Sequence, residues 1–166
     1  VSGKTAEVVV VDVERRTVSG RIKVPHVIEG LAISPDGGTL YCCAQTAAEF
    51  YVIDARSDAL RRTVPIQGAD ASKKQMRRVR VSPDNKYLVV SSNQDHHAAI
   101  YQADDLQQIA SFPTMKSPMG FGFAADGKHA YLCCHDDAVV CEFELANGRV
   151  TRSFSTAAGC EFIVAY

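Results

Sequence analysis

The sequence predicts an all-β protein, a β-propeller of four-stranded antiparallel blades. The first observation is a motif, Ser34-Pro35-Asp36-Gly37, which returns as Ser82-Pro83-Asp84-Asn85 and, altered, as Ala124-Ala125-Asp126-Gly127. The second is the period: the motifs lie 48 and 42 residues apart, and the ends of another strand type repeat at 42, 48 and 42 residues. Those ends are Asp12, Asp54, Gln102 and Glu144. A period of about 40 to 45 residues with several short strands is typical of propeller blades.

The 166 residues form a single domain with repeats at approximately 6–47, 48–95, 96–137 and 138–166. The first repeat opens with a predicted strand at Glu7–Val13. Alternating or continuous apolar runs in the next unit predict strands at Ile28–Ser34, Thr39–Ala44, Phe50–Ala55 and Leu60–Pro65. The Pro-Asp-Gly motif joins the first strand to the second, because Pro presets φ while Asp and Gly tolerate a tight bend. The final segment, Cys160–Tyr166, matches only the first strand of a further unit.

The best-formed repeat resembles a known family. Residues 28–43, Ile-Glu-Gly-Leu-Ala-Ile-Ser-Pro-Asp-Gly-Gly-Thr-Leu-Tyr-Cys-Cys, followed by Phe50-Tyr-Val-Ile-Asp, are similar to the YVTN-type β-propeller repeat. The sequence departs from that repeat where the repeat has Val-Thr-Asn, the end of the motif that gives it its name. Here those positions hold Cys42-Cys43-Ala44, Val90-Ser91-Ser92 and Leu132-Cys133-Cys134. The resemblance implies a scaffold of the kind used by amine dehydrogenases, lyases, lactonases, surface-layer proteins and interaction platforms.

The repeats account for about three and three-quarter blades. Closed propellers have roughly four to eight blades. The chain is therefore a half-propeller completed by a second copy as a homodimer, a fragment of a seven- or eight-bladed ring, or a four-bladed ring. Self-association or the remaining blades of a longer chain would cover the strand faces that an open arc exposes. The absence of an initiator Met at Val1 favours the longer chain.

Bulk composition excludes only extremes. The chain is 46% hydrophobic and 22% charged, with a formal net charge of −1. This balance excludes nucleic-acid binding through bulk positive charge, and no apolar run is long enough for a membrane span. The family resemblance implies an extracytoplasmic or periplasmic location, whereas cysteines on strands indicate a reducing compartment.

The six cysteines are predicted to be small buried residues between blades. Cys42-Cys43 and Cys133-Cys134 are strand neighbours that point to opposite faces, and no Cys-x-x-Cys spacing occurs. A cross-strand bridge between Cys141 and the 133–134 pair is the alternative.

One end of the ring should carry the functional loops, because fourth-to-first and second-to-third connections emerge opposite the Pro-Asp-Gly turns. Four of the five histidines fall on this loop-bearing face. Imidazole and carboxylate groups bind metal ions. The candidate metal ligands are His96, His97, His135 and Asp136. Ordinary polar turns are the alternative, and no cofactor is otherwise predicted.

A cationic segment precedes the first strand of the third blade. Residues 71–80 hold five cations in a nearly neutral chain, and alternation places Arg78 and Arg80 on one strand face. Such a pair can bind a carboxylate or phosphate in bidentate fashion. The predicted ligand-binding set is His26, Glu29, Lys73, Lys74, Arg77, Arg78 and Arg80. The alternative is that these charges pair with acidic residues of adjacent blades.

The sequence thus favours a ligand- or protein-binding scaffold that acts through the loop-bearing face over the central channel, with a protein or a small acidic ligand as partner. The alternative is an enzyme, or the propeller subunit of one, of oxidoreductase, lyase or lactonase type. A surface-layer or adhesion module is the second alternative. Neither a Gly-x-Ser-x-Gly elbow nor a glycine-rich phosphate loop supports nucleophilic or nucleotide chemistry.

Overall fold

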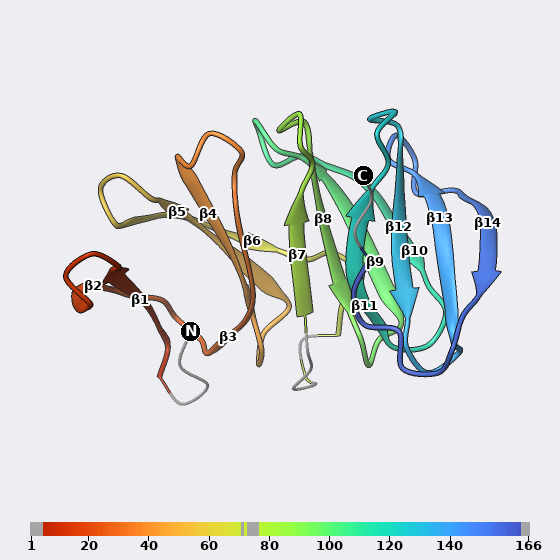
Figure 1. The fold of residues 1–166 in the computed structure, drawn as a ribbon, viewed down its shortest axis with the longest axis horizontal. Coiled ribbons are helices and arrows are strands. Elements are labelled where there is room, and N and C mark those ends of the chain that lie inside the picture. Colours follow the sequence, from red (N-terminus) through yellow and green to blue (C-terminus); the bar gives the residue numbers. More distant parts are fainter. Residues whose placement is uncertain (1–4, 71, 73–76, 164–166) are drawn as a thin grey trace.

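The computed structural model describes residues 5–70, 72 and 77–163, which form fourteen β-strands and no helix. The strands of the first two sheets are β1 (Glu7–Asp12), β2 (Thr17–Lys23), β3 (Ile28–Ile33), β4 (Thr39–Ala44), β5 (Glu49–Asp54) and β6 (Ala59–Pro65). The strands of the other two are β7 (Arg77–Val81), β8 (Tyr87–Ser92), β9 (His97–Gln102), β10 (Gln108–Pro113), β11 (Pro118–Phe123), β12 (His129–Cys134), β13 (Val139–Glu144) and β14 (Val150–Ser155). Figure 1 shows them in chain order.

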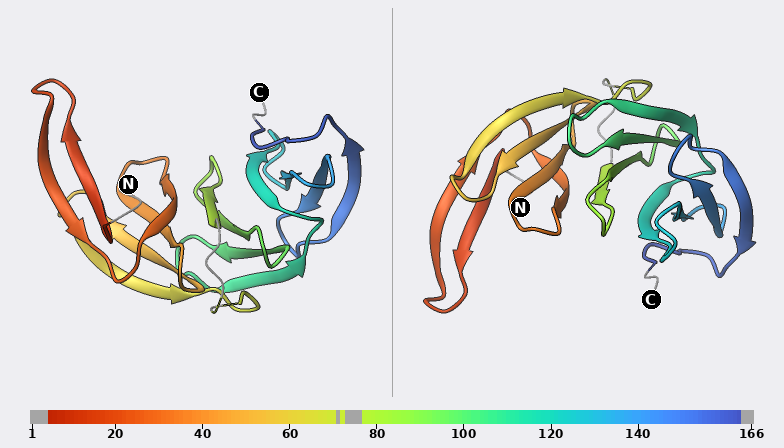
Figure 2. Two further views of the ribbon diagram at one scale, coloured as in Figure 1. Left: turned by 90° about the horizontal axis from the view of Figure 1, so that it is seen from below. Right: turned by 90° about the horizontal axis from the view of Figure 1, so that it is seen from above.

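The strands form three antiparallel sheets of four and one sheet of two. Each four-stranded sheet is a meander in chain order: β3 to β6, β7 to β10 and β11 to β14, while β1 pairs with β2. The sheets stand side by side in an open arc, with β3, β7 and β11 on the concave side and β6, β10 and β14 on the convex side (Figure 2). The predicted all-β propeller architecture is confirmed, and the strands of the second blade lie within one residue of their predicted bounds.

The hydrophobic core lies between the blades, in three clusters that each join neighbouring sheets. One cluster joins Tyr41 and Phe50 of the second blade to Leu88 and Tyr101 of the third. The rings of Phe50 and Tyr101 meet edge to face, with centroids 5.1 Å apart. A second cluster joins the third and fourth blades, and a third joins β1 and β2 to the second blade. The blades are therefore held by their neighbours, as in other repeat proteins.

The Pro-Asp-Gly motif forms the turn expected between first and second strands. Ser34 Oγ donates to Asp36 Oδ1 at 2.5 Å and accepts from the Thr39 N–H at 2.9 Å. Gly37 lies at φ 70°, and Asn85 holds the same turn position at φ 58°. Asn is among the few non-glycine residues that tolerate this left-handed region, so the altered motif keeps the same turn.

Glycine on the inner strand allows the next blade to come close. A Cβ placed on Gly30 would collide with the backbone carbonyl of Arg77, and one on Gly120 would collide with the carbonyl of Glu161. Residues 161 and 162 therefore lie against β11 as β7 lies against β3, in the inner position of a further blade. Together with the fourteen strands, this segment fits about three and three-quarter blades.

The predicted final strand, Cys160–Tyr166, is not formed over its described part. Residues 160–163 lie in the inner position without strand hydrogen bonding, and 164–166 fall outside the described residues. A strand needs a ladder partner, and no second strand of this further blade lies among the described residues. No helix in the described part of the chain is long and apolar enough to span a membrane.

Candidate functional site

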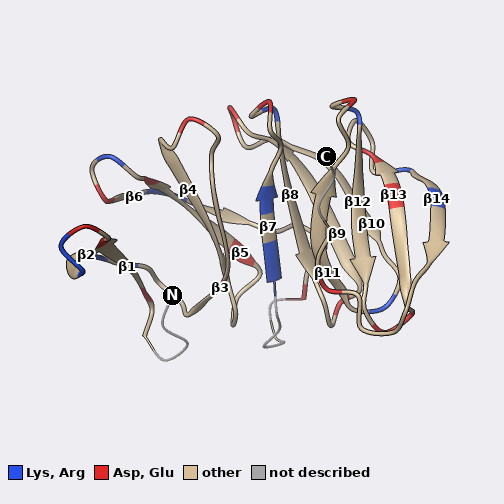
Figure 3. Ribbon diagram, in the orientation of Figure 1, with Lys and Arg blue, Asp and Glu red and all other residues tan. Residues whose placement is uncertain are grey.

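The concave side of the arc holds a small hollow between three inner strands. Its volume is about 280 Å³. Its walls are Glu29, Gly30 and Leu31 of β3, Arg78, Val79 and Arg80 of β7, Gly120 and Phe121 of β11, and Phe162. Figure 3 shows β7 as a cationic inner strand. Most acidic residues lie in the turns or on other strands. The hollow therefore combines two guanidinium groups with apolar walls.

The two arginines that face the hollow differ in their partners. Arg78 Nη1 lies 3.3 Å from Glu29 Oε1, and both side chains are about one quarter exposed. Glu29 also accepts from Gln45 Nε2 at 3.0 Å. Arg80 is exposed, and within the described ranges it makes no ion pair. Arg78 is thus oriented by its carboxylate partner, while Arg80 keeps an uncompensated positive charge.

Arg77 points away from the hollow and is fully buried. Its Nη1 donates to the carbonyls of Ala44 and Gln45, both at 3.2 Å, and its Nη2 donates to the carbonyl of Asp70 at 2.9 Å. Its Nε donates to Ser92 Oγ at 3.2 Å. Burial lowers the pKa of the guanidinium, and the charge of Asp95 opposes that shift. Arg77 therefore ties the second blade to the third and is not available to a ligand in this structure.

A chain of hydrogen bonds joins the loops that the sequence placed on one face. The Ser117 N–H donates to His96 Nδ1 at 3.1 Å, and Ser117 Oγ donates to Asp136 Oδ2 at 2.5 Å. His135 Nδ1 lies 2.8 Å from Asp136 Oδ1. Hydrogen bonds from Ser117 and then from His135 lower the pKa of Asp136. His96, His135 and Asp136 are thus brought together across the β8–β9, β10–β11 and β12–β13 connections.

The remaining predicted residues lie elsewhere. His97 is buried with Nε2 2.7 Å from Ser111 Oγ, and the exposed His26 lies 3.8 Å from Glu49 Oε1. Lys73 and Lys74 fall outside the described residues. Across residues 5–70, 72 and 77–163, no group of three or more His, Cys, Asp or Glu side chains could hold a metal ion. The metal site therefore stays a prediction, and no cluster of ligands among the described residues supports it.

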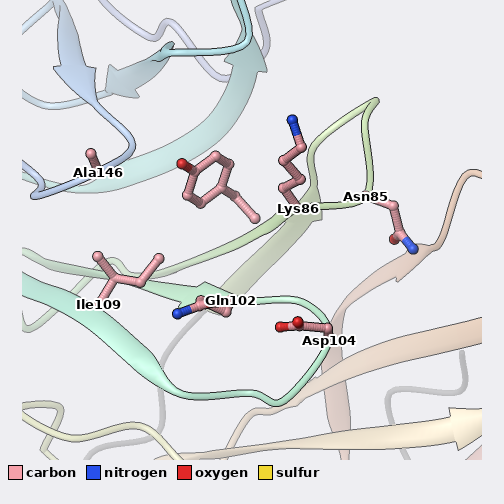
Figure 4. A pocket seen from close by; sticks show the side chains of 7 residues that line it. Asn85, Lys86, Gln102, Asp104, Ile109 and Ala146 are labelled. Carbon is pink, nitrogen blue, oxygen red and sulfur yellow. The ribbon is translucent and has the colours of Figure 1, made fainter.

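A larger hollow of about 540 Å³ lies at the opposite ends of the strands (Figure 4). Asn85 and Lys86 come from the β7–β8 turn, Gln102 and Asp104 from the end of β9, and Ala146 from the fourth blade. The cation that lines it, Lys86, already pairs with Asp84, with Nζ 3.2 Å from Oδ2. We favour the smaller hollow as the candidate site because Arg80 lines it without an ion-pair partner among the described residues and because apolar side chains form part of its walls.

Sequence reasoning missed the apolar walls and the hydrogen-bonded serine. Phe121 and Phe162 lie on different segments that meet only in the folded arc. In the sequence, both belong to apolar strand patterns that are typical of a hydrophobic core. Ser117 lies at φ 53°, a strained value for a residue other than Gly, Asn or Asp. A serine directly before Pro118 gives no signal of that kind in the sequence.

Comparison with known proteins supports the fold. No protein-family profile matches the sequence. Proteins named 6-phosphogluconolactonase from Klebsiella pneumoniae and Sodalis glossinidius are both 32% identical to this chain, over 91 and 92 residues. These matches cover 52% and 54% of this chain but only 27% and 26% of those proteins. The chain thus matches about a quarter of the length of these curated relatives.

Solved structures are similar over most of the chain. Kuenenia stuttgartiensis hydrazine synthase superposes with a TM-score of 0.76 at 21% identity, covering 89% of this chain and 42% of that one. The WD40 repeats of RRP9 superpose with a TM-score of 0.73 at 16% identity, covering 86% and 43%. At such low identities these similarities show the propeller fold alone.

Proposed function

We propose that this chain is part of a propeller scaffold that binds a small ligand carrying a carboxylate or a phosphate, in the hollow on its concave side. The observation that carries the proposal is the pair Arg78 and Arg80, which line one hollow from the same face of β7. Arg80 has no ion-pair partner in the described part of the chain. An anion is the natural complement of that charge.

The walls strengthen the interaction with an anion. Leu31, Phe121 and Phe162 are apolar, and they exclude water from part of the space beside the guanidinium groups. A charge interaction gains strength where water is displaced, because the local dielectric constant falls. The volume of about 280 Å³ lies just below the usual range for small-molecule sites, so the hollow suits a compact ligand.

The relatives favour a second candidate function. Two proteins similar over about half of this chain are named for the hydrolysis of a phosphorylated gluconolactone. We propose, as the alternative, a lactonase-type activity in which the phosphate of the substrate pairs with Arg78 and Arg80. We further propose that the blades are YVTN-type repeats and that a second copy or further blades of a longer chain complete the ring.

The test is calorimetric binding of 6-phosphogluconate, with glucose as the uncharged reference. We expect the wild-type chain to bind the anion, and Arg80→Gln to weaken binding about tenfold or more, since a charge-assisted hydrogen bond contributes about 1.5–3 kcal/mol. Arg56→Gln is the matched control, because Arg56 is an arginine in the β5–β6 turn, away from the hollow. Equal binding by wild type, Arg80→Gln and Arg56→Gln would overturn the anion site.

The lactonase alternative needs a separate assay. Proton release from the corresponding phosphorylated lactone, measured above the spontaneous rate, would support it. A chain that binds 6-phosphogluconate but leaves the lactone rate unchanged supports the scaffold and rejects the enzyme.

A further inference from the structure

Four of the six cysteines gather at one end of the fourth blade. Cys133 and Cys134 end β12, Cys141 lies on β13, and Cys160 follows β14. All six cysteines of the chain are free thiols in the structure. The other two, Cys42 and Cys43, are fully buried in the second blade.

The four thiols divide into two pairs on opposite faces of the sheet. Neighbouring residues on a strand point to opposite faces. Cys134 and Cys141 belong to the core shared with the third blade. Cys133 therefore points to the other face, which the segment after β14 reaches. Burial, with the neighbouring Cys160 thiol and a hydrogen bond to it, raises the pKa of Cys133 to about 11.

The backbone fixes Cys160 in this place. Its Sγ lies 3.7 Å from the carbonyl oxygen of Cys134 and 3.6 Å from the carbonyl oxygen of Val139. Cys134 and Val139 are opposite each other in the β12–β13 ladder. The next residue, Glu161, lies directly against Gly120, where a Cβ would collide with its carbonyl. A Cβ on Gly122 would lie 3.0 Å from Ile163 Cγ2. The two glycines of β11 thus seat residues 161–163, and this seating holds Cys160 beside β12.

We propose that Cys133 and Cys160 form a reversible disulfide that fastens the segment after β14 to the fourth blade. A hydroperoxide is the oxidant. Cys160 is the more accessible thiol, partly exposed where Cys133 is 1% exposed. Its thiolate attacks the peroxide oxygen, which breaks the O–O bond and yields a sulfenic acid and an alcohol or water. The Cys133 sulfur then displaces hydroxide from the Cys160 sulfur, and its proton leaves with that hydroxide as water.

Two other pairings are disfavoured by geometry. Cys141 is opposite Leu132, so Cys134 and Cys141 are diagonal in the ladder. A hydrogen bond between these two thiols raises the pKa of Cys134 and lowers that of Cys141, so the sulfurs are in contact. As diagonal neighbours, however, the two residues have Cα atoms about 7–8 Å apart, beyond the usual span of a disulfide. Cys133 and Cys134 are adjacent and point apart. Cys134 and Cys141 face the third blade, whereas Cys133 points to the opposite face, where Cys160 is its neighbour.

The bridge would act on a segment that also reaches the concave side. Phe162 is a wall of the hollow, and Glu161 Oε1 lies 3.9 Å from His135 Nε2. The bridge depends on the thiols and the seating alone, so it stands whether or not the hollow binds an anion.

Peptide mapping tests the proposal directly. The native chain is treated with hydrogen peroxide, alkylated and digested with trypsin. Cleavage after Lys128, Arg149 and Arg152 places Cys133, Cys134 and Cys141 on peptide 129–149 and Cys160 on peptide 153–166. We expect these two peptides to be joined and to separate on reduction. Peptide 129–149 carrying an internal bridge, or both peptides fully alkylated after peroxide, would overturn the proposal.

Variants identify the partner of Cys160. The joined peptide should persist in Cys134→Ala and in Cys43→Ala, which removes the equivalent strand cysteine of the second blade, and should disappear in Cys133→Ala. A joined peptide that persists in Cys133→Ala would assign the bridge to another cysteine and overturn the pairing. Oxidised wild type should melt roughly 5–15 °C above its reduced form, because the bridge closes a loop in the unfolded chain.

Discussion

At one position of the repeat, on the inner strand, the size of the residue affects how closely the next inner strand approaches. The equivalent positions on the inner strands are Gly30, Arg78, Gly120 and Phe162. Where glycine occurs, the next inner strand approaches closely, and where Arg78 occurs, β7 and β11 contact each other less than β3 and β7 do. Arg78 therefore both separates two strands and supplies charge to the space between them.

Arg77 should matter more for stability than its exposed neighbour does. We expect Arg77→Ala to lower the free energy of unfolding by about 3 kcal/mol or more, because one buried and two partly buried carbonyls lose their donor. Arg77→Lys should recover only part of this loss, since an ammonium group lacks the planar fork. Urea unfolding measures the effect, with Arg80→Gln as control within about 0.5 kcal/mol of wild type. Equal midpoints for Arg77→Ala and Arg80→Gln would contradict the role of Arg77 as a tie.

His97 should make stability depend on pH. Burial lowers the pKa of its imidazole, and the charge of Asp95 opposes this shift. Its Nδ1 is buried without a hydrogen bond to any described residue. A histidine with a lowered pKa leaves stability unchanged above its unfolded pKa of about 6.5 and reduces it as the pH falls below that value, because the unfolded chain takes up the proton first.

The measurement is the unfolding midpoint in urea between pH 7.5 and pH 5. We expect the wild-type midpoint to fall across this range and the His97→Gln midpoint to change less. Parallel curves for the two proteins would show that another group causes the dependence.

At the scale of elements, the close contact between inner strands sets the spacing of blades. Gly30 lies against the backbone of Arg77 and Arg78, where no side-chain movement can make room for a Cβ. We expect Gly30→Ala to destabilise the chain by about 2 kcal/mol or more through overpacking. Gly38→Ala is the matched control, because its Cβ would meet only the flexible carboxylate of Asp36 at 3.2 Å. Thermal unfolding of both variants measures the effect. Equal losses of stability in Gly30→Ala and Gly38→Ala would show that β3 and β7 can move apart to accommodate a Cβ.

The strands and turns of the second blade could be predicted from sequence to within one residue, because period-two patterns and Pro-Asp-Gly turns are local signals. Alternation also separated Arg77 from Arg78 and Arg80 correctly. It could not show which face looks into the channel, because β7 is flanked by protein on both sides. The contact of Gly120 with Glu161, and of Cys133 with Cys160, depends on how successive blades stack, which no local pattern records.

At the scale of the whole molecule, the arc leaves apolar side chains exposed at both ends. Val11 and Val18 are 54% and 52% exposed at one end, and Phe154 is 42% exposed at the other. Exposed apolar faces of this kind favour association. We expect two copies to pair end to end.

Light scattering on the purified chain checks this expectation. The mass should be about 36 kDa, twice that of one 18.0 kDa chain. Phe154→Asp should return it to that of a single chain, whereas Phe112→Leu, in the core shared by the third and fourth blades, should leave the pair intact. A wild-type mass near 18.0 kDa would contradict the two-copy ring.

The glycine and arginine on the inner strands have a geometric consequence. The number of blades that close a circle depends on the wedge angle between neighbours, and that angle depends on how near their inner strands come. Gly30 lets β7 come close to β3, whereas β7, which carries Arg78, lies in less contact with β11. The residue at position 78 therefore bears on both the local curvature of the arc and the charge of its concave side.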